Sequence, residues 1–149
     1  MPSAGGMTFH GDKALMAALD GLGGPGARRA MRQALAPGAS IISKAAKRGA
    51  RARDWPGIAL SIGRRKKTYK DDDNVVEVIG ARYAYVWKKT GERPSTWAHA
   101  AEFGPNARPF FRAAVQMSEG DAFSAIRAKA RLTIPKEAAK QARKRGGRR

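Results

Sequence analysis

Residues 97–114 read WAHAAEFG, then PNA, then RPFFRAA. Aromatic residues make up only 7% of the chain, yet Phe103, Phe110 and Phe111 all lie in this segment, and each carries a large apolar area. The patterns before the segment are helical and then strand-like, whereas the pattern after it is helical. We therefore expect residues 97–114 to form the hinge between the two halves of the molecule.

Two local structures fit the first half of this hinge. Ser95 or Thr96 can cap a short helix over residues 97–103, which Gly104 would end in the left-handed conformation. Alternating side chains over the same residues also fit a strand, although the alanines favour the helix. Pro109 suits the first position of the helix that follows, because a first-turn residue needs no partner for an N–H group.

Two helices are expected before the hinge. The spacing of leucines and alanines predicts the first over residues 12–22, ended by the glycine-rich run 21–26, and the second over about residues 27–47. Pro37 cannot donate a hydrogen bond to the carbonyl of Gln33, but the apolar periodicity continues across it. We therefore expect one kinked helix here rather than two separate helices.

Strands are expected between these helices and the hinge. Side chains alternate in character at residues 58–62 and 83–87, which is typical of half-buried strands, and the valine-rich residues 75–79 are expected to form another strand. Residues 64–74 are polar and suit a hairpin loop, and residues 88–95 suit a second exposed loop. The order of elements predicts an α+β fold, in which an antiparallel sheet of about three to four strands is covered by N-terminal and C-terminal helices.

The helix after the hinge is expected to be interrupted. Ser118 and Asp121 have the spacing of a capping box, so we expect the helix to pause and restart near Gly120. An apolar stripe then continues to Ile134, and Pro135 is expected to end or kink the helix.

The chain fits one domain. Its 149 residues suggest a flexible N-terminal arm at 1–9, a single α+β domain at 10–135 and a basic, flexible C-terminal tail at 136–149. The sequence has no run of about 18 apolar residues and no charged start followed by an apolar core. We therefore expect a soluble protein without a membrane-spanning helix or a signal peptide.

The charge predicts an anionic partner. Thirty Lys and Arg residues against twelve Asp and Glu residues give a net charge of +18 and a pI near 11.3. Nucleic acid, an acidic protein surface or a membrane surface fits such an excess. The candidate contacts to DNA or to an acidic partner lie on the second helix and in the C-terminal tail: Arg28, Arg29, Arg32, Lys44, Lys47, Arg48, Arg143, Lys144, Arg145, Arg148 and Arg149.

The sequence offers little for catalysis. The chain has no cysteine and only two histidines, and it contains neither a phosphate-binding loop nor a nucleophile elbow. His99 and Glu102 invite interpretation as an acid–base pair, but no nucleophile or second acid accompanies them, and a structural carboxylate is the better interpretation. The acidic run 71–73 suits a solvated loop better than a cation site. We expect neither an enzyme nor a bound cofactor or metal.

The aromatic side chains have a structural interpretation. Phe103, together with Phe110 or Phe111, is expected in the core. The aromatic side chains at residues 83–87 are expected in the core or in a subunit contact, rather than as stacking platforms for bases.

The hinge motifs resemble those of one known family. The run WAHAAEFG, a short loop and RPFFRAA are similar to the signature of the tail-completion, or neck, family of head–tail joining proteins in long-tailed double-stranded DNA phages. That family typically carries an aromatic-Ala-x-x-Val-Glu-Phe/Tyr-Gly-Thr run, a variable loop and then Pro-Phe-Leu-Arg-Pro-Ala. Ala101, Pro105 and Ala113 depart from this pattern, and residues 83–95 look like an inserted hairpin. The resemblance covers about residues 10–135, although only the two hinge motifs are distinctive.

The resemblance implies a structural virion protein, assembled in the bacterial cytoplasm and located at the neck. Such proteins form a ring that completes the tail and joins it to the head, with DNA passing through. The implied partners are further copies in a ring, taken to be a hexamer, the neighbouring head-closure or adaptor and tail-terminator or tail-tube proteins, and the genomic DNA. The motif residues implied to hold the hinge are Trp97, Glu102, Phe103, Gly104, Pro109, Phe110 and Arg112.

Two questions stay open at this point. The resemblance does not separate the tail-completion position from the head-closure and tail-terminator positions. A basic nucleic-acid-binding or packaging protein is the alternative, and it rests on the same cations that were named above.

Overall fold

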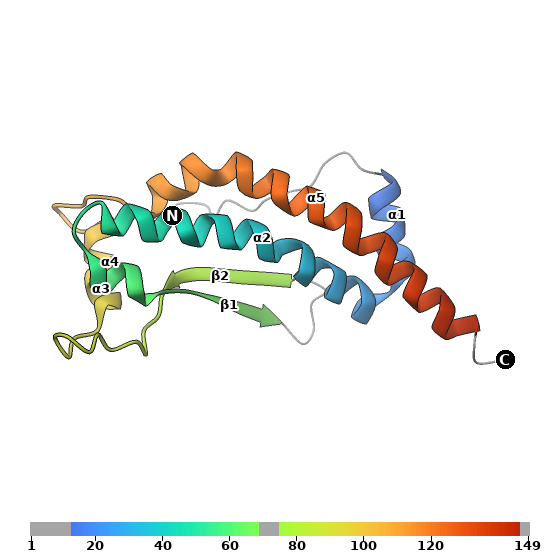
Figure 1. Cartoon of the computed structure of the whole chain (residues 1–149), viewed down its shortest axis with the longest axis horizontal. Helices are drawn as coiled ribbons and strands as arrows, with labels where there is room; N and C mark the ends of the chain where they lie inside the picture. Colours follow the sequence, from blue (N-terminus) through green and yellow to red (C-terminus); the bar gives the residue numbers. More distant parts are fainter. Residues whose placement is uncertain (1–12, 69–74, 147–149) are drawn as a thin grey trace.

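The computed structural model describes residues 13–68 and 75–146, and Figure 1 shows its elements. The predicted arm and the acidic run 71–73 lie outside the described residues. In chain order the elements are α1 (Lys13–Leu22), α2 (Gly24–Arg51), α3 (Pro56–Ser61), β1 (Ile62–Thr68), β2 (Val75–Ala81), α4 (Pro94–Phe103) and α5 (Phe111–Gly146).

Helices α2 and α5 form the centre of the fold and run antiparallel to each other (Figure 1). Arg29 near the start of α2 lies 3.7 Å from the Glu137 carboxylate near the end of α5. Small side chains allow two helices to approach closely. The buried residues of this pair include Ala30, Ala34 and Ala46 on α2 and Ala122, Ala130 and Ile134 on α5.

The middle of α2 approaches α5 closely at Gly38. A Cβ atom at Gly38 would overlap the side chain of Ile126, so only glycine fits at this point. The preceding residue, Pro37, lies inside α2, which continues through it. The prediction of one helix across Pro37 is therefore confirmed.

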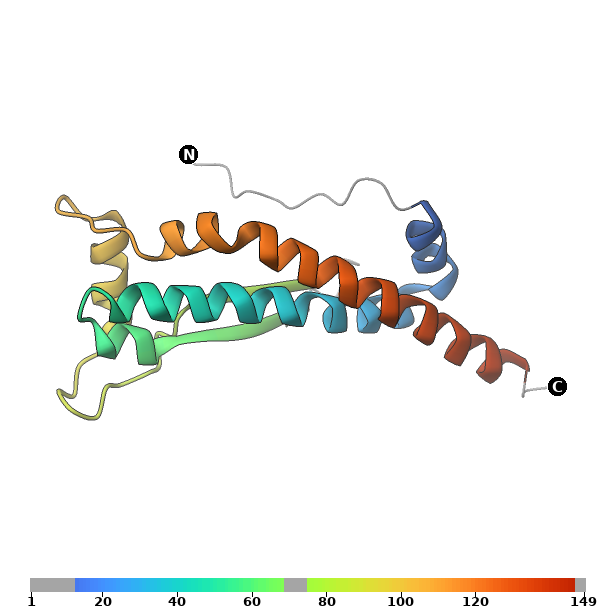
Figure 2. The same cartoon turned by 45° about the horizontal axis from the view of Figure 1, so that its top comes forward.

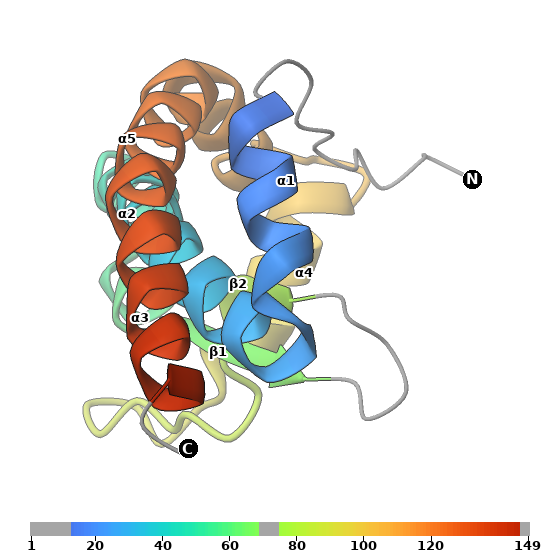
Figure 3. The same ribbon diagram turned by 90° about the vertical axis from the view of Figure 1, so that its right-hand side faces the viewer.

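Helix α1 closes one end of the α2–α5 pair. Leu22 is buried in a cluster with alanines of α2 and with Ile134 of α5, and Leu19 packs against this cluster. Figure 3 views the molecule from this end and shows α1 beside α5. The predicted stop is confirmed, because α1 ends at Leu22 and Gly23 follows with a φ of 65°, in the left-handed region that favours glycine.

The β1–β2 hairpin packs on α2, on the side away from α5 (Figure 1). Its strands pair antiparallel, with Ile62 opposite Ala81. Arg64 of β1 ties the hairpin to the helix: its Nη1 donates to the carbonyl oxygen of Ala36 at 2.8 Å and lies 3.7 Å from the carboxylate of Glu77 on β2.

A second core cluster forms where α2, α3, α4 and α5 meet. Phe110 is its largest member and is 3% exposed. Its other buried residues are Ala46, Ala50, Ile58, Ala59, Ile62, Ala98 and Ala114. The hinge thus lies against the core that joins the helices to the hairpin.

The sheet is smaller than the sequence suggested. The described residues form two strands, so the α+β class fits while the expected three to four strands are wrong. Of residues 58–62, only Ile62 lies in a strand, as the first residue of β1. Pro56 starts a helix, α3, that is only six residues long, too short to display a helical period. Residues 64–67, which were expected in a loop, instead belong to β1.

The third expected strand is also absent from the described residues. Residues 83–87 form turns and irregular backbone between β2 and α4. Tyr83 is 69% exposed, which contradicts a place in the core. Trp87 is half-buried and packs against α3, since a Cβ atom at Gly57 would lie 2.8 Å from its ring.

Helix α5 is continuous over 36 residues. The hydroxyl of Ser118 donates to the Ala114 carbonyl at 2.6 Å within the same helix, so the expected capping box and pause near Gly120 are wrong. Helix α5 does not end at Pro135, and the part of the predicted tail up to Gly146 is helical. None of the helices in residues 13–68 and 75–146 is long and apolar enough to cross a membrane.

Candidate functional site

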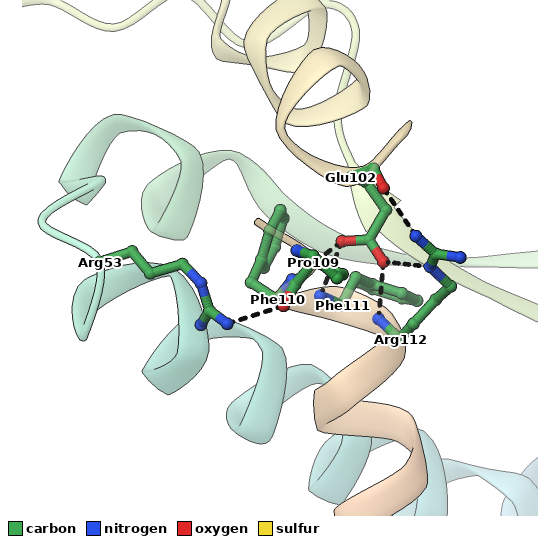
Figure 4. A network of polar contacts seen from close by, with 6 residues as sticks. All are labelled: Arg53, Glu102, Pro109, Phe110, Phe111 and Arg112. Atoms are coloured by element: carbon green, nitrogen blue, oxygen red, sulfur yellow. Dashed lines mark hydrogen bonds and ion pairs between the residues drawn. The ribbon is translucent and has the colours of Figure 1, made fainter. Parts of the chain in front are cut away.

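The two hinge motifs meet at one carboxylate, that of Glu102 in the last turn of α4 (Figure 4). Its Oε2 accepts hydrogen bonds from the backbone N–H groups of Phe110 and Phe111, each at 3.0 Å. Its Oε1 accepts from the backbone N–H of Arg112 at 2.9 Å and from the Arg112 Nε at 3.0 Å. Four donors from the second motif therefore converge on one residue of the first.

The arrangement caps the start of α5. The first backbone N–H groups of a helix have no partner within the helix, and they carry the positive end of its dipole. Glu102 supplies both an acceptor for three of these groups and a negative charge beside them. The side chain is 6% exposed, so it is a buried structural carboxylate.

The environment lowers the pKa of Glu102. Burial acts in the opposite direction, because it disfavours the charged form and so raises the pKa. Hydrogen bonds from the backbone amides of Phe111, Arg112 and Phe110 and from the Arg112 side chain stabilise the carboxylate, and together they outweigh the burial. The carboxylate is thus held in its ionised form.

A second contact joins the hinge to α2. The Nη2 of Arg53 donates to the carbonyl oxygen of Pro109 at 2.7 Å (Figure 4). Its Nη1 donates to the carbonyl of Gly49 at 3.1 Å. The ring of Trp55 meets that of Phe110 edge-on, with centroids 5.9 Å apart. The turn before α5 is therefore held from α4 on one side and from the end of α2 on the other.

Gly104 is needed for space rather than for an unusual backbone angle. Its φ is −71°, so the expected left-handed conformation is wrong. A Cβ atom at this position would overlap the carbonyl oxygen of Ala100, to which the Gly104 N–H donates at 2.8 Å. The chain then turns tightly, with the N–H of Arg108 donating to the Ala101 carbonyl at 2.9 Å.

The helical interpretation of the first motif is confirmed, and so is its end at Phe103, but its predicted start is wrong. Helix α4 begins at Pro94, with Arg93 in the N-cap position and no side-chain hydrogen bond to the cap, so neither Ser95 nor Thr96 is the N-cap. Proline is favoured in the first turn of a helix, and Pro94 was the signal that sequence reasoning missed. Helix α5 begins at Phe111, two residues after Pro109.

The aromatic residues of the hinge divide into two groups. Phe110 is buried, as predicted, and Phe111 packs against the same cluster. Phe103 is 60% exposed, so its expected place in the core is wrong. The Arg112 guanidinium lies 5.1 Å from the centre of the Phe103 ring, and His99 packs on the same ring at 5.2 Å. Trp97 is also largely exposed.

The structure gives no support to an acid–base pair. Both carboxylate oxygens of Glu102 are occupied by donors from residues 110–112, while His99 contacts Phe103. Within residues 13–68 and 75–146, no group of three or more His, Asp or Glu side chains could hold a metal ion.

The candidate cations do not form one patch. Arg28, Arg29 and Arg32 lie near the start of α2, whereas Lys44, Lys47 and Arg48 lie near its end, roughly 30 Å away for 20 residues of helix. Arg29 of the first group faces the end of α5, where Arg29 and Lys144 line a small pocket of about 220 Å³ together with Glu137.

The C-terminal candidates are described only in part. Arg143 and Lys144 are exposed on the last turns of α5, Arg148 and Arg149 lie outside the described residues, and nothing is described of the Arg145 side chain. Arg29 is not a free cation, because Glu137 of α5 lies beside it. Sequence spacing within one helix carries no signal for such a partner on another helix.

No family model, curated protein or solved structure matches this chain.

Proposed function

We propose that the chain is a structural virion protein of the neck of a long-tailed double-stranded DNA phage. It forms a ring that completes the tail and joins it to the head, and the genome passes through the ring. It acts by assembly rather than by catalysis, and it needs no cofactor.

The contact between the two hinge motifs carries this proposal. The motifs that resemble the neck family are eight residues apart at Glu102 and Phe110, and the Glu102 carboxylate joins them through the N–H groups that start α5. Several of the motif residues have a defined role there. Glu102 caps α5, and Gly104 allows the close approach to the Ala100 carbonyl. Phe110 is buried in the core, and Arg112 binds the main-chain oxygen of Glu102. A shared motif with a defined structural role supports membership of that family.

The proposed partners follow from a position at the head–tail junction. Neighbouring copies would form the ring, taken to be a hexamer, and the layers above and below would be head-closure or adaptor proteins and tail-terminator or tail-tube proteins. A ring with one kind of neighbour contact requires head-to-tail pairing, because isologous pairing stops at a dimer. The net charge of +18 suits contact with acidic neighbours or with DNA in the channel.

The test is a deletion in a phage that encodes the chain. The proposal predicts that the deletion leaves DNA-filled heads and separate tails, and that the intact gene supplied in trans restores joined particles. The proposal is wrong if the deletion mutant makes normal infectious particles and the protein is absent from wild-type particles.

A basic nucleic-acid-binding or packaging protein is the second candidate. The observation that favours it is the group of cations near the start of α2 and the end of α5, which the fold brings to one end of the molecule. This candidate predicts tight binding of duplex DNA by the purified chain, with affinity falling steeply as salt rises. Assembly of particles without any DNA affinity of the chain would exclude it.

A further inference from the structure

An open groove of about 680 Å³ lies at the α3–α4 end of the molecule. All three tryptophans of the chain line it: Trp55 just before α3, Trp87 from the segment between β2 and α4, and Trp97 from α4. Trp97 is 58% exposed, and the other two are half-buried. A groove lined by partly exposed aromatic side chains is typical of a binding site.

The groove carries two exposed carboxylates. Asp54 and Glu92 line it together with one base, Lys89. Among the described residues neither carboxylate lies in an ion pair, whereas three other acids of the fold each lie beside an arginine. The N–H of Trp87 donates to the Glu92 carbonyl at 2.9 Å, which holds the loop that carries Glu92 beside the groove. In a chain of net charge +18, this surface has more acid than base.

The opposite end of the molecule presents complementary chemistry. Figures 1 and 2 show the last turns of α5 extending beyond α1 and beyond the start of α2. Lys136, Lys140 and Arg143 are four and three residues apart, so they share one face of the helix, and all three are exposed. Ala139 is exposed on the same face and leaves room for a large ring to approach.

The two surfaces cannot meet within one molecule. Helix α5 begins beside α4, whose Trp97 lines the groove, and its 36 residues span roughly 54 Å. We propose that the tryptophan-lined groove of one copy binds the basic C-terminal end of α5 of a second copy.

The chemistry of both surfaces supports this pairing. Asp54 and Glu92 would pair with cations of the incoming helix, in a setting partly shielded from water where such pairs fix the register of an interface. The indole faces attract Lys and Arg side chains through cation–π interactions. The methyl group of Ala139 would pack against a ring between the cations.

The contact is heterologous, since each copy offers one groove and one helix end. Copies joined in this way form a ring if the rotation between neighbours closes, and a filament if it does not. The inference rests on the proposed function and deepens it by naming the surfaces that join neighbouring subunits.

The experiment uses the full chain with charge reversals at one end at a time. The groove variant is Asp54→Lys with Glu92→Lys, and the helix variant is Lys136→Glu with Arg143→Glu. The matched controls reverse equally exposed charges elsewhere on α5, namely Glu119→Lys with Asp121→Lys and Arg127→Glu with Lys129→Glu. Circular dichroism checks that every variant is folded, and sedimentation velocity at about 50 mM salt, where surface charges are weakly screened, measures assembly.

The wild type and both controls are expected to form species larger than a dimer. The groove variant and the helix variant should each stay monomeric alone. An equimolar mixture of the two should again form species larger than a dimer, because the cationic groove of one variant faces the acidic helix end of the other, and the acidic groove of the second faces the basic helix end of the first. A variant with all four reversals should assemble again, because the opposite charges have been exchanged.

Several results would overturn the contact: a wild type that stays monomeric at every concentration, single-end variants that assemble alone like the wild type, or a mixture of the two variants that stays monomeric. Loss of assembly in the groove variant alone would mean that another segment of the second copy fills the groove. The proposed function is judged separately in phage particles. If the chain is present at the junction but its assembly is insensitive to these reversals, the proposed function stands and the proposed contact is wrong. If the chain assembles as described but is absent from particles, the contact stands and the proposed function is wrong.

Discussion

The Arg112 guanidinium donates two hydrogen bonds to Glu102: its Nε donates to the Oε1 of the side chain at 3.0 Å, and its Nη2 donates to the main-chain oxygen at 2.8 Å. The same carboxylate accepts three backbone N–H groups at the start of α5. The last turn of α4 and the first turn of α5 are therefore held in one geometry by a single pair of residues.

Removal of the Glu102 carboxylate should destabilise the fold. Glu102→Ala leaves the buried N–H of Phe110 without an acceptor, and we expect a loss of about 2–3 kcal/mol in the free energy of unfolding. Glu102→Gln keeps one acceptor oxygen and should lose about 1 kcal/mol. Urea denaturation measures both values. Glu119→Ala, at an exposed position of α5, is the control and should change stability by less than about 0.5 kcal/mol. Equal stability of Glu102→Ala and this control would contradict the role of Glu102.

The contribution of Glu102 should depend on pH in one direction. Its pKa is lower in the folded chain than the ordinary value of 4.5, so its stabilising effect is fully present above that value and is lost as the pH falls through the folded pKa. The stability difference between the wild type and Glu102→Gln should therefore be constant at neutral pH and shrink in acid. Urea denaturation from about pH 7 to about pH 3 measures this difference. A difference that grows in acid would refute the lowered pKa.

Gly104→Ala and Gly120→Ala should change stability in opposite directions. The methyl group at position 104 would overlap the Ala100 carbonyl oxygen, and we expect a loss of about 1–3 kcal/mol. Gly120 lies inside α5, and a methyl group added there would have nothing within 4 Å, so alanine should raise stability by about 0.5–1 kcal/mol. Thermal unfolding of both variants compares the signs directly. If Gly104→Ala left the stability unchanged, the turn would have to relax around the added methyl group without loss of free energy, which would contradict the close approach.

The two motif phenylalanines should differ strongly in their energetic weight. Phe110 is 3% exposed and anchors the second core cluster, so Phe110→Ala should cost about 3–5 kcal/mol. Phe103 is 60% exposed and mainly offers its ring to Arg112, so Phe103→Ala should cost less than about 1 kcal/mol. Denaturant midpoints of the two variants, which serve as controls for each other, check this order. Similar costs would place Phe103 in the core after all.

The elements with a sustained pattern could be predicted from the sequence. Apolar residues recur at helical spacing in α1 and α2, and a valine-rich run marks β2. The structural role of the Glu102 carboxylate also followed from the sequence. Contacts between distant segments leave no local signal. One example is the hydrogen bond from Arg53 to the Pro109 carbonyl, which lies 56 residues further along the chain.

The failures have identifiable physical causes. Strand β1 is mostly cationic and has no apolar alternation; it forms because β2 pairs with it and because Arg64 reaches the Ala36 carbonyl of α2. Helix α3 is too short for its period to appear, and alternation at residues 58–62 imitates a strand. Helix α5 continues past Pro135, whose side chain is exposed, so packing along α2 and α1 outweighs one missing N–H donor.

The head–tail junction itself is where the proposed function can be tested most directly. Cryo-electron microscopy of particles from a phage that encodes the chain, with mass spectrometry of the same particles, measures whether the chain is present there. We predict a ring of density between head and tail that accommodates α2 and α5 side by side with the β1–β2 hairpin, built from copies of this chain. A fully interpreted junction in which every ring belongs to other proteins would contradict the proposed function.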